Sequence, residues 1–226
     1  MPFFSIVIIH YEGSVSKQEA VRCLLSFYNQ RFRDFEILFL HDGPRERPWE
    51  SDEFPVPVDI PLQNIQTQQR MNDYGHSLRD AGINIARGRY VLITNADNYH
   101  YPDMLQMLYD EAVKKYTPIL INDIDRKAAD ILVFGILAKG YISAGDGIVD
   151  LRKRRPDLAE HQWLYMSGYP TIFRNIDCMQ FVMRRDLWLK EGGWFRREMG
   201  ADGLLFQEFV KRYGVRYIIG PLGEHH

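Results

Sequence analysis

Short apolar runs separated by helix-like stretches dominate the first half of the sequence. Residues 3–9 (FFSIVII) and 35–40 (FEILFL) are rich in β-branched and aromatic residues, as in strands that are covered on both faces. From Lys17 the apolar residues recur at helical spacing, and a second such stretch at 75–87 precedes another apolar run at 90–94 (YVLIT). This alternation predicts an α/β fold whose central sheet is mostly parallel, with right-handed crossovers.

The spacing of apolar residues also predicts which face of each helix is buried. Three helices are expected to turn the following residues inward: Val21, Leu24, Leu25 and Tyr28; Leu78, Gly82, Ile85 and Ala86; and, after Pro102, Met104, Leu105, Leu108 and Ala112.

The remaining elements are less regular. The sequence predicts strands at 119–121, 131–137 and 178–183, an edge strand at 56–62, a helix at 204–213, and a surface loop from a Gly-rich hinge at 140–147 to the basic residues 152–155.

Composition excludes several classes of protein. The 226 residues include 28 Lys and Arg against 30 Asp and Glu, whereas a nucleic-acid-binding protein would carry a clear basic excess. No apolar run approaches the roughly 20 residues that span a bilayer, and residues 3–9 lack the flanks of a signal peptide. Cys23 and Cys178 have no Cys-x-x-Cys spacing, so we expect buried reduced thiols in a cytoplasmic protein.

Candidate binding residues follow the predicted strands, because ligands of open α/β sheets bind at the carboxyl ends of the strands. Those ends carry His10, Tyr11 and Glu12; Asp42 and Gly43; and Asn95, Ala96, Asp97 and Asn98. The sequence has no dinucleotide-binding Gly-x-Gly-x-x-Gly after its first strand, no Gly-x-x-x-x-Gly-Lys phosphate loop and no Gly-x-Ser-x-Gly elbow. Carboxylates and short polar side chains at these positions suit a cation and a phosphorylated ligand.

The order and spacing of these residues resemble the family 2 inverting glycosyltransferases of the GT-A fold, which use nucleotide-sugar donors. The likeness runs through residues 5–11, 25–30, 35–43, 75–90 and 95–105, and resumes at Arg184, Gly192, Gly193, Trp194, Gly200 and Asp202. It leaves out roughly residues 123–175. The resemblance implies one domain over residues 1–226, with a nucleotide-binding half (1–100) and an acceptor-binding half (101–226).

The resemblance also implies a role for individual residues. Asp42 matches the acid that meets the nucleotide base, commonly uracil, and His10 and Tyr11 match the wall of the same pocket. The other matches are Arg79 at the donor diphosphate, Asn95 and Ala96 in the nucleotide-binding segment, Asp97 as the anchor of Mn²⁺ or Mg²⁺, Asp202 as the general base, and His225 or His226 as a further metal ligand. The implied reaction, typical of polysaccharide assembly, moves a sugar from a UDP-sugar to a hydroxyl of a saccharide, glycolipid or glycoprotein with inversion.

Three positions depart from the family's pattern. The first acid of the metal motif is Asn95, whose amide can coordinate a hard cation but brings no charge. At two places where the family has a pair of acids, this sequence keeps only the second acid: it has His41 with Asp42, and Ala201 with Asp202. These departures keep open a catalytically degenerate module that binds nucleotide or carbohydrate. A sugar-1-phosphate nucleotidyltransferase is a further alternative, although the basic Gly-rich loop that it needs is lacking after the first strand.

Several candidates also have a purely structural interpretation. Asp42 and Asp97 lie in stretches typical of turns, and Asp202 precedes a helical stretch that it can cap. Arg79 can lie on a solvated helix face. The terminal histidines are also typical of a purification-tag remnant.

Two further groups of residues have open roles. Trp188 and Trp194 suit either the core or a platform for a sugar ring. The basic residues 152–155 suit a solvated loop, or contact with anionic lipid or a phosphorylated acceptor, which leaves peripheral membrane contact open.

Overall fold

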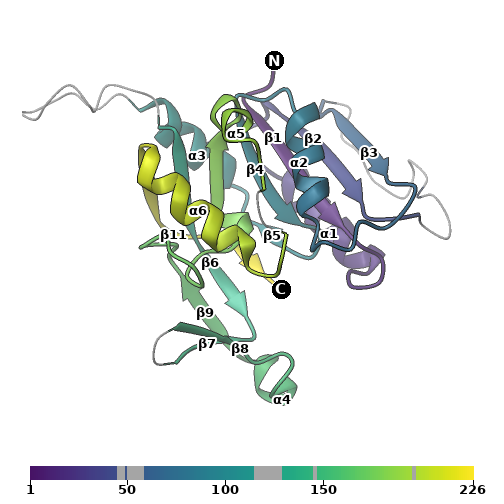
Figure 1. Ribbon diagram of the computed structural model, residues 1–226, viewed down its shortest axis with the longest axis vertical. Coiled ribbons are helices and arrows are strands. Elements are labelled where there is room, and N and C mark those ends of the chain that lie inside the picture. The colour runs from purple at the N-terminus through teal and green to yellow at the C-terminus, as the bar shows by residue number, and fades with distance from the viewer. Residues whose placement is uncertain (45–48, 50–58, 115–128, 145–146, 195–196) are drawn as a thin grey trace, which may run out of the picture.

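The computed structural model describes residues 1–44, 49, 59–114, 129–144, 147–194 and 197–226 (Figure 1). In chain order the strands are β1 (Phe4–His10), β2 (Phe35–His41), β3 (Leu62–Gln66), β4 (Tyr90–Asn95), β5 (Tyr99–His100), β6 (Ile131–Lys139), β7 (Tyr141–Ala144), β8 (Gly147–Asp150), β9 (Trp163–Met166), β10 (Phe181–Arg184) and β11 (Val215–His225). The helices are α1 (Lys17–Tyr28), α2 (His76–Ile85), α3 (Met104–Val113), α4 (Pro156–Ala159), α5 (Arg185–Glu191) and α6 (Ala201–Arg212).

A single large sheet organises the described residues. Its strand order is β3-β2-β1-β4-β10-β6-β11-β5, and β9 pairs with β6 beside this path. Parallel pairing joins β3, β2, β1 and β4, with β1 and β2 buried along their whole length. The carboxyl ends of these parallel strands therefore meet at one edge, where the candidate residues were expected.

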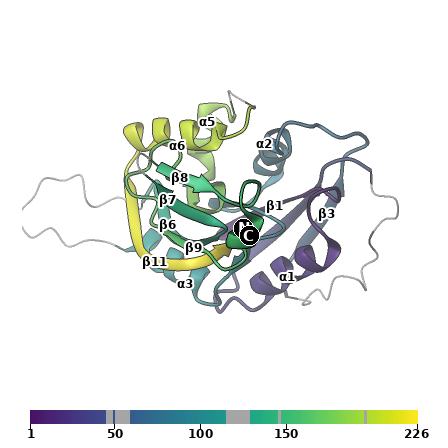
Figure 2. The same cartoon turned by 90° about the horizontal axis from the view of Figure 1, so that it is seen from below.

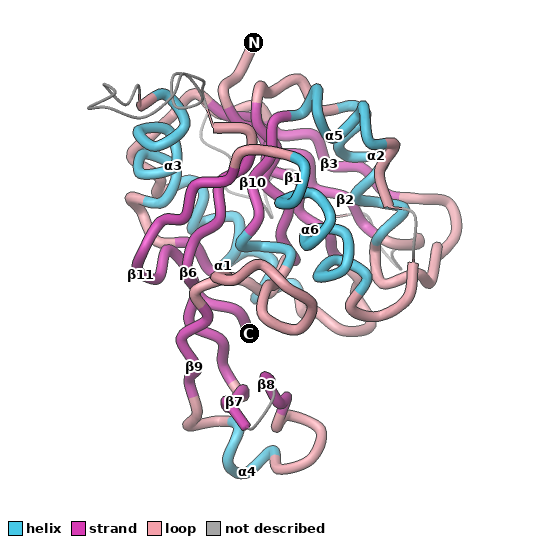
Figure 3. Tube along the Cα trace, turned by 60° about the vertical axis from the view of Figure 1, so that its left-hand side comes forward, coloured by secondary structure: helices cyan, strands magenta, loops and turns pink. Residues whose placement is uncertain are grey.

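The second half of the sheet mixes strand directions. β10 lies antiparallel between β4 and β6, while β6 and β11 are parallel. β5 and β9 are antiparallel to their partners. Strands β7 and β8 form a separate two-stranded sheet that projects from the body together with α4 (Figure 3).

Two apolar layers hold the helices against the sheet. Side chains of a strand alternate between its faces, so Phe4 and Ile8 of β1 pack in the layer that includes α1 and α3. Val7 and Ile9 pack in the layer that includes α2, α5 and α6. Figure 2 shows the two groups of helices on opposite sides of the sheet. The predicted α/β class, a mostly parallel sheet flanked by helices as in the GT-A fold, is confirmed.

The buried faces of two helices differ in part from the prediction. In α1, Leu25 is 39% exposed, and the buried side is formed by Ala20, Cys23, Leu24, Phe27 and Tyr28. In α2, Ile85 is exposed and Ile83 is buried instead. In each helix the true buried face is displaced by one or two residues from the predicted one, because the spacing of apolar residues alone does not determine the exact orientation of the helix. The inward residues of α3 are as predicted.

Several irregular segments also differ from the prediction. The stretch expected as a Gly-rich hinge contributes to β7 and β8, and residues 178–180 form a 3₁₀ turn ahead of β10. The edge strand is β3, which begins at Leu62; residues 56–58 and the predicted strand at 119–121 lie outside the described residues. The strands β9 and β11 and the helix α5 were not predicted, because each mixes polar and apolar residues without a clear period.

The tryptophan pair belongs to the core. Trp188 and Trp194 are 2% and 4% exposed and their rings lie 5.1 Å apart. They pack beneath α6 against Phe206, so neither forms a platform for a sugar ring. Cys23 and Cys178 are free, buried thiols. Within the described part of the chain, no helix combines the length and apolarity needed to cross a membrane.

Candidate functional site

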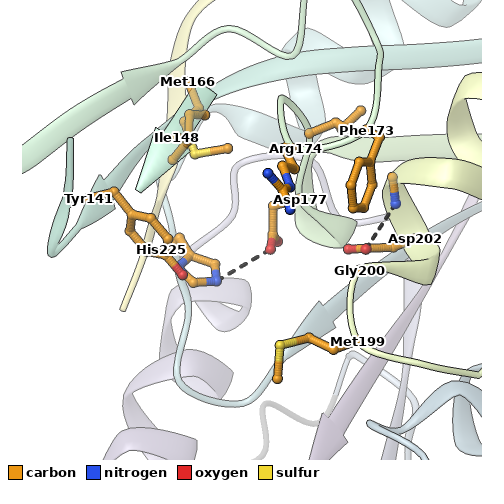
Figure 4. Close-up of a pocket in the computed structure, with 12 residues that line it drawn as sticks. Tyr141, Ile148, Met166, Phe173, Arg174, Asp177, Met199, Gly200, Asp202 and His225 are labelled. Carbon is orange, nitrogen blue, oxygen red and sulfur yellow. Dashed lines mark hydrogen bonds and ion pairs between the residues drawn. The ribbon is translucent and has the colours of Figure 1, made fainter. Parts of the chain in front are cut away.

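A cavity of about 660 Å³ opens at the carboxyl ends of β1, β2 and β4. Asp42, Asp97 and Asp202 all line it, although more than 150 residues separate the first from the last. A second cavity of about 440 Å³ adjoins it and shares Asp177 and Asp202 (Figure 4). The three acids that the sequence singled out therefore surround one continuous hollow.

One end of the larger cavity offers a planar, partly charged surface. The guanidinium of Arg70 lies 3.6 Å from the centre of the Tyr11 ring, and its Nε is 3.9 Å from Asp42 Oδ2. Asp42 is buried, and its Oδ1 accepts a hydrogen bond of 2.7 Å from the backbone of Met71. An aromatic face beside a fixed carboxylate suits a nucleotide base, since the ring can stack and the acid can accept an N–H.

Arg79 places a buried positive charge in the lining of the larger cavity. It is only 5% exposed and donates to the carbonyl of Tyr74 at 2.7 Å and to Asn95 Oδ1 at 2.7 Å. Its Nε is buried without a partner, and no described carboxylate forms an ion pair with it. A solvated helix face is thus excluded for Arg79. A desolvated guanidinium with donors to spare suits phosphate oxygens.

Asp97 and His225 each present an unpartnered buried atom. Asp97 Oδ1 and His225 Nδ1 have no hydrogen-bond partner among the described residues. Burial raises the pKa of the Asp97 carboxyl, and the ring of His225, when it is protonated, offsets only part of this effect. A carboxylate oxygen and an imidazole nitrogen without partners are donor atoms that suit Mn²⁺, and the carboxylate also suits Mg²⁺, so these residues fit the cation that the resemblance implied.

Asp202 lies in the first turn of α6 but does not cap it. The N-cap is Gly200, with φ of 80°, and Asp202 Oδ1 accepts from the backbone of Gly203 at 2.9 Å. The cap-only interpretation is therefore wrong. Burial, together with the negative charge of Asp177, raises the pKa of Asp202 to about 6. A carboxylate with a pKa near neutrality is suited to take a proton from a hydroxyl.

Some predicted site residues do not line either cavity. Both ring nitrogens of His10 are engaged, by Val15 O at 2.9 Å and by His41 Nδ1 at 2.5 Å, because this side chain points to the α1 face of the sheet. The Ala96 side chain packs in the core and its N–H donates to the carbonyl of Ile9. His226 pairs with Glu224 at 3.2 Å. For these three, the structure places the side chain away from the cavity.

The structure adds site residues that the sequence did not indicate. Asp177 lines both cavities, and its carboxylate, the thiol of Cys178 and the carboxylate of Asp202 lie within 4.8 Å of one another. Arg152 and Lys153 also line the larger cavity; the sequence offered these basic residues as a solvated loop or as a contact with anionic lipid or a phosphorylated acceptor. The pair Asp177 and Gln180 forms a capping box, a pattern visible in the sequence, but that pattern predicts a turn and not a place in a cavity.

These carboxylates and the buried Arg79 lie at the carboxyl edge of the parallel strands, where α/β proteins bind their ligands. Residues 5–131, more than half of the chain, match the family model described as Glycosyl transferase family 2. The chain belongs to this family.

The chain is also similar to individual proteins. "Uncharacterized glycosyltransferase EpsJ" of Bacillus subtilis (strain 168) is 29% identical over 120 residues, 53% of this chain and 33% of EpsJ. TarS of S. aureus (residues 1–349) has a TM-score of 0.65 at 14% identity, covering 98% of this chain and 60% of TarS. The mannosyltransferase PcManGT of Pyrobaculum calidifontis, solved with GDP-Man and Mn²⁺, has a TM-score of 0.58 at 15% identity, covering 97% of this chain and 55% of PcManGT. This chain thus spans a third to three-fifths of these proteins.

Proposed function

We propose that this chain transfers a sugar from a nucleoside-diphosphate sugar, with a UDP-sugar favoured, to a hydroxyl of an acceptor, with inversion at the anomeric carbon. The observation that carries the proposal is that Asp42, Asp97 and Asp202 line one cavity beside the buried Arg79. These residues supply a base contact, a cation ligand, a proton acceptor and a phosphate contact within one site.

The relatives support the choice of donor class. TarS has been solved in complex with UDP and with UDP-GlcNAc, and PcManGT with GDP-Man and Mn²⁺. In this chain we assign the base to the surface formed by Tyr11, Asp42 and Arg70. Arg79 would then hold the diphosphate, with Asn95 orienting its guanidinium through the 2.7 Å hydrogen bond.

The chemistry proposed for Asp202 is a single displacement. Its carboxylate takes the proton of the acceptor hydroxyl while that oxygen attacks the anomeric carbon from the face opposite the diphosphate. The bond from the anomeric carbon to the phosphate oxygen breaks, and the nucleoside diphosphate leaves with the electron pair. A divalent cation, when bound, neutralises charge on the leaving diphosphate, and Asp97 and His225 are the residues that would hold it.

The smaller cavity is our candidate for the acceptor. It shares Asp202 with the larger cavity but is not lined by Tyr11 or Asp42. Its lining includes Tyr141, Met166, Phe173 and Arg174. Apolar and aromatic walls suit the faces of sugar rings. We propose a nucleotide-binding half in residues 1–100, an acceptor-binding half in residues 101–226, and a saccharide, glycolipid or glycoprotein as the acceptor.

Calorimetry with UDP, GDP and dTDP, each with Mn²⁺ or with EDTA, tests the proposal, followed by transfer assays with the matching nucleotide sugars. We expect one nucleotide to bind more tightly with Mn²⁺ and its sugar conjugates to be consumed when an acceptor is present. Asp42→Asn should weaken nucleotide binding, whereas the matched surface variant Asp34→Asn should not. Failure of all three nucleotides to bind would contradict the proposal.

A degenerate binding module is the second candidate, and Asn95 is the observation that favours it, because a neutral amide replaces one expected cation ligand. It predicts nucleotide binding that EDTA leaves unchanged, with no transfer to any acceptor. The unpartnered Asp97 Oδ1 and His225 Nδ1 favour the enzyme instead. We also propose a role in polysaccharide assembly, a cytoplasmic location and peripheral contact with a membrane.

A further inference from the structure

His225, which is buried, lies against the half-buried Asp177; Asp177 lines both cavities and His225 lines the smaller one. His225 ends β11, and Asp177 precedes the 3₁₀ turn Cys178–Gln180 that leads into β10. The ring Nε2 lies 3.4 Å from Asp177 Oδ2, the contact drawn in Figure 4. Within this pair His225 is only 9% exposed, so water contributes little to fixing the orientation of its ring.

The two oxygens of Asp177 have different partners. Oδ1 accepts a hydrogen bond of 2.9 Å from the backbone N–H of Met179, which fixes the carboxylate plane. Oδ2 is thereby held toward the ring of His225. A rigid acceptor on one side of an imidazole selects the tautomer that carries its proton on the facing nitrogen, here Nε2.

That choice leaves the other ring nitrogen as a lone-pair donor. His225 Nδ1 is buried and has no partner among the described residues, and neither has Asp97 Oδ1. Histidines that bind metals typically donate their second N–H to a carboxylate, which orients the ring and makes the metal-binding nitrogen more basic. The contact of His225 Nε2 with Asp177 Oδ2 at 3.4 Å places the same two groups beside each other.

We infer that Asp177 is a positioning residue that holds His225 with Nδ1 directed to the cation site it would form with Asp97. The inference rests on the proposed function. It would also explain how the site could bind a cation although position 95 is a neutral asparagine whose Oδ1 accepts a hydrogen bond from Arg79. Asp177 would supply negative charge to the site indirectly, through its contact with His225.

The variant Asp177→Asn separates this role from a merely structural one. An asparagine can keep the turn, because its single oxygen can still accept from Met179 N–H. Its NH₂ group then replaces Oδ2 opposite the ring, and a donor there forces the proton of His225 from Nε2 to Nδ1. The cation site would lose its imidazole ligand while the fold is retained.

Two readouts test the inference without measuring transfer. Nitrogen NMR of histidine-labelled protein at alkaline pH reads the tautomer of His225, and electron paramagnetic resonance of free Mn²⁺, in the presence of UDP, gives the affinity for the cation. We expect an Nε2–H tautomer in the parent protein, an Nδ1–H tautomer in Asp177→Asn, and a loss of Mn²⁺ affinity of about 10- to 100-fold. Glu224→Gln is the matched control, since it makes the same change beside His226 and should alter neither Mn²⁺ affinity nor the tautomer of His225.

Several outcomes would overturn the inference. Equal Mn²⁺ affinities in the parent protein and Asp177→Asn would do so, as would an Nδ1–H tautomer in the parent protein, or an equal loss of affinity in Glu224→Gln. Absence of Mn²⁺ binding by the parent protein would also overturn it. In that case the proposed function would still be tested separately, by measuring sugar transfer in EDTA.

Discussion

Arg79 and Asn95, which both line the larger cavity, are joined by a hydrogen bond of 2.7 Å from the guanidinium to the amide oxygen. An aspartate at position 95 would form an ion pair here and cancel the charge of Arg79. The neutral amide orients the guanidinium and leaves its charge available to an anionic ligand.

Asn95→Asp should therefore weaken binding of UDP when metal is removed with EDTA. A charged hydrogen bond contributes about 1.5–3 kcal/mol, so we expect a loss of roughly 10-fold or more in affinity, measured by calorimetry. Asn84→Asp adds the same charge on the exposed side of α2 and should change the affinity little. An unchanged affinity in Asn95→Asp would show that Arg79 does not contact the nucleotide.

The raised pKa of Asp202 predicts the pH dependence of transfer. Because the base must be deprotonated, kcat/KM should rise as the pH increases through about 6 and then level off. The folded-state pKa lies above that of an unfolded Asp, so the contribution of this group to stability is lost as the pH rises through the same interval. Asp202→Asn should lower kcat by about 100- to 10,000-fold and leave nucleotide affinity unchanged. Full activity in this variant would exclude Asp202 as the base.

Glu36 should stabilise the start of the parallel sheet. Burial opposes its charge, but hydrogen bonds from Ser5 Oγ at 2.6 Å and from the backbone and side chain of Arg87 lower its pKa overall. Its stabilisation is present above the unfolded pKa and is lost as the pH falls through the lower, folded value. Glu36→Gln should cost about 2 kcal/mol at neutral pH in urea denaturation. Glu208→Gln, at an exposed pair with Lys211, is the control and should leave the midpoint unchanged.

Gly88 allows the entry to β4 to approach β1 closely. A Cβ at this position would lie 2.5 Å from the backbone nitrogen of Ser5 and 2.6 Å from the carbonyl carbon of Phe4, neither of which can move without shifting β1. We expect Gly88→Ala to destabilise the fold by about 1–3 kcal/mol in thermal or urea unfolding. At Gly214 the nearest neighbour of a Cβ would be Asp130 Oδ2, 3.8 Å away, so Gly214→Ala should differ little from the parent protein. Similar stabilities for the two variants would contradict this account.

The pattern of apolar residues correctly predicted the strands and helices that are buried uniformly along their length. β1, β2 and β4 are buried on both faces, so their apolar runs are continuous, and α3 has one clean apolar stripe. It failed where burial is uneven, as in β11, whose eleven residues include two glycines, a proline and register shifts against β6. Such a strand is specified by its partners and not by its own pattern.

From the sequence by itself we could determine which residues form the parallel strands, which acids follow their carboxyl ends, and that the chain belongs to the glycosyltransferase family. All three depend on the spacing of residues that are close along the chain. Only the tertiary structure decided which of two adjacent histidines faces the acids, that Asp177 joins them, and that His10 turns away. Neighbouring residues of a strand point to opposite faces, so a one-residue difference in register reverses the choice. That register is set by contacts between β11 and β6, which lie far apart along the chain.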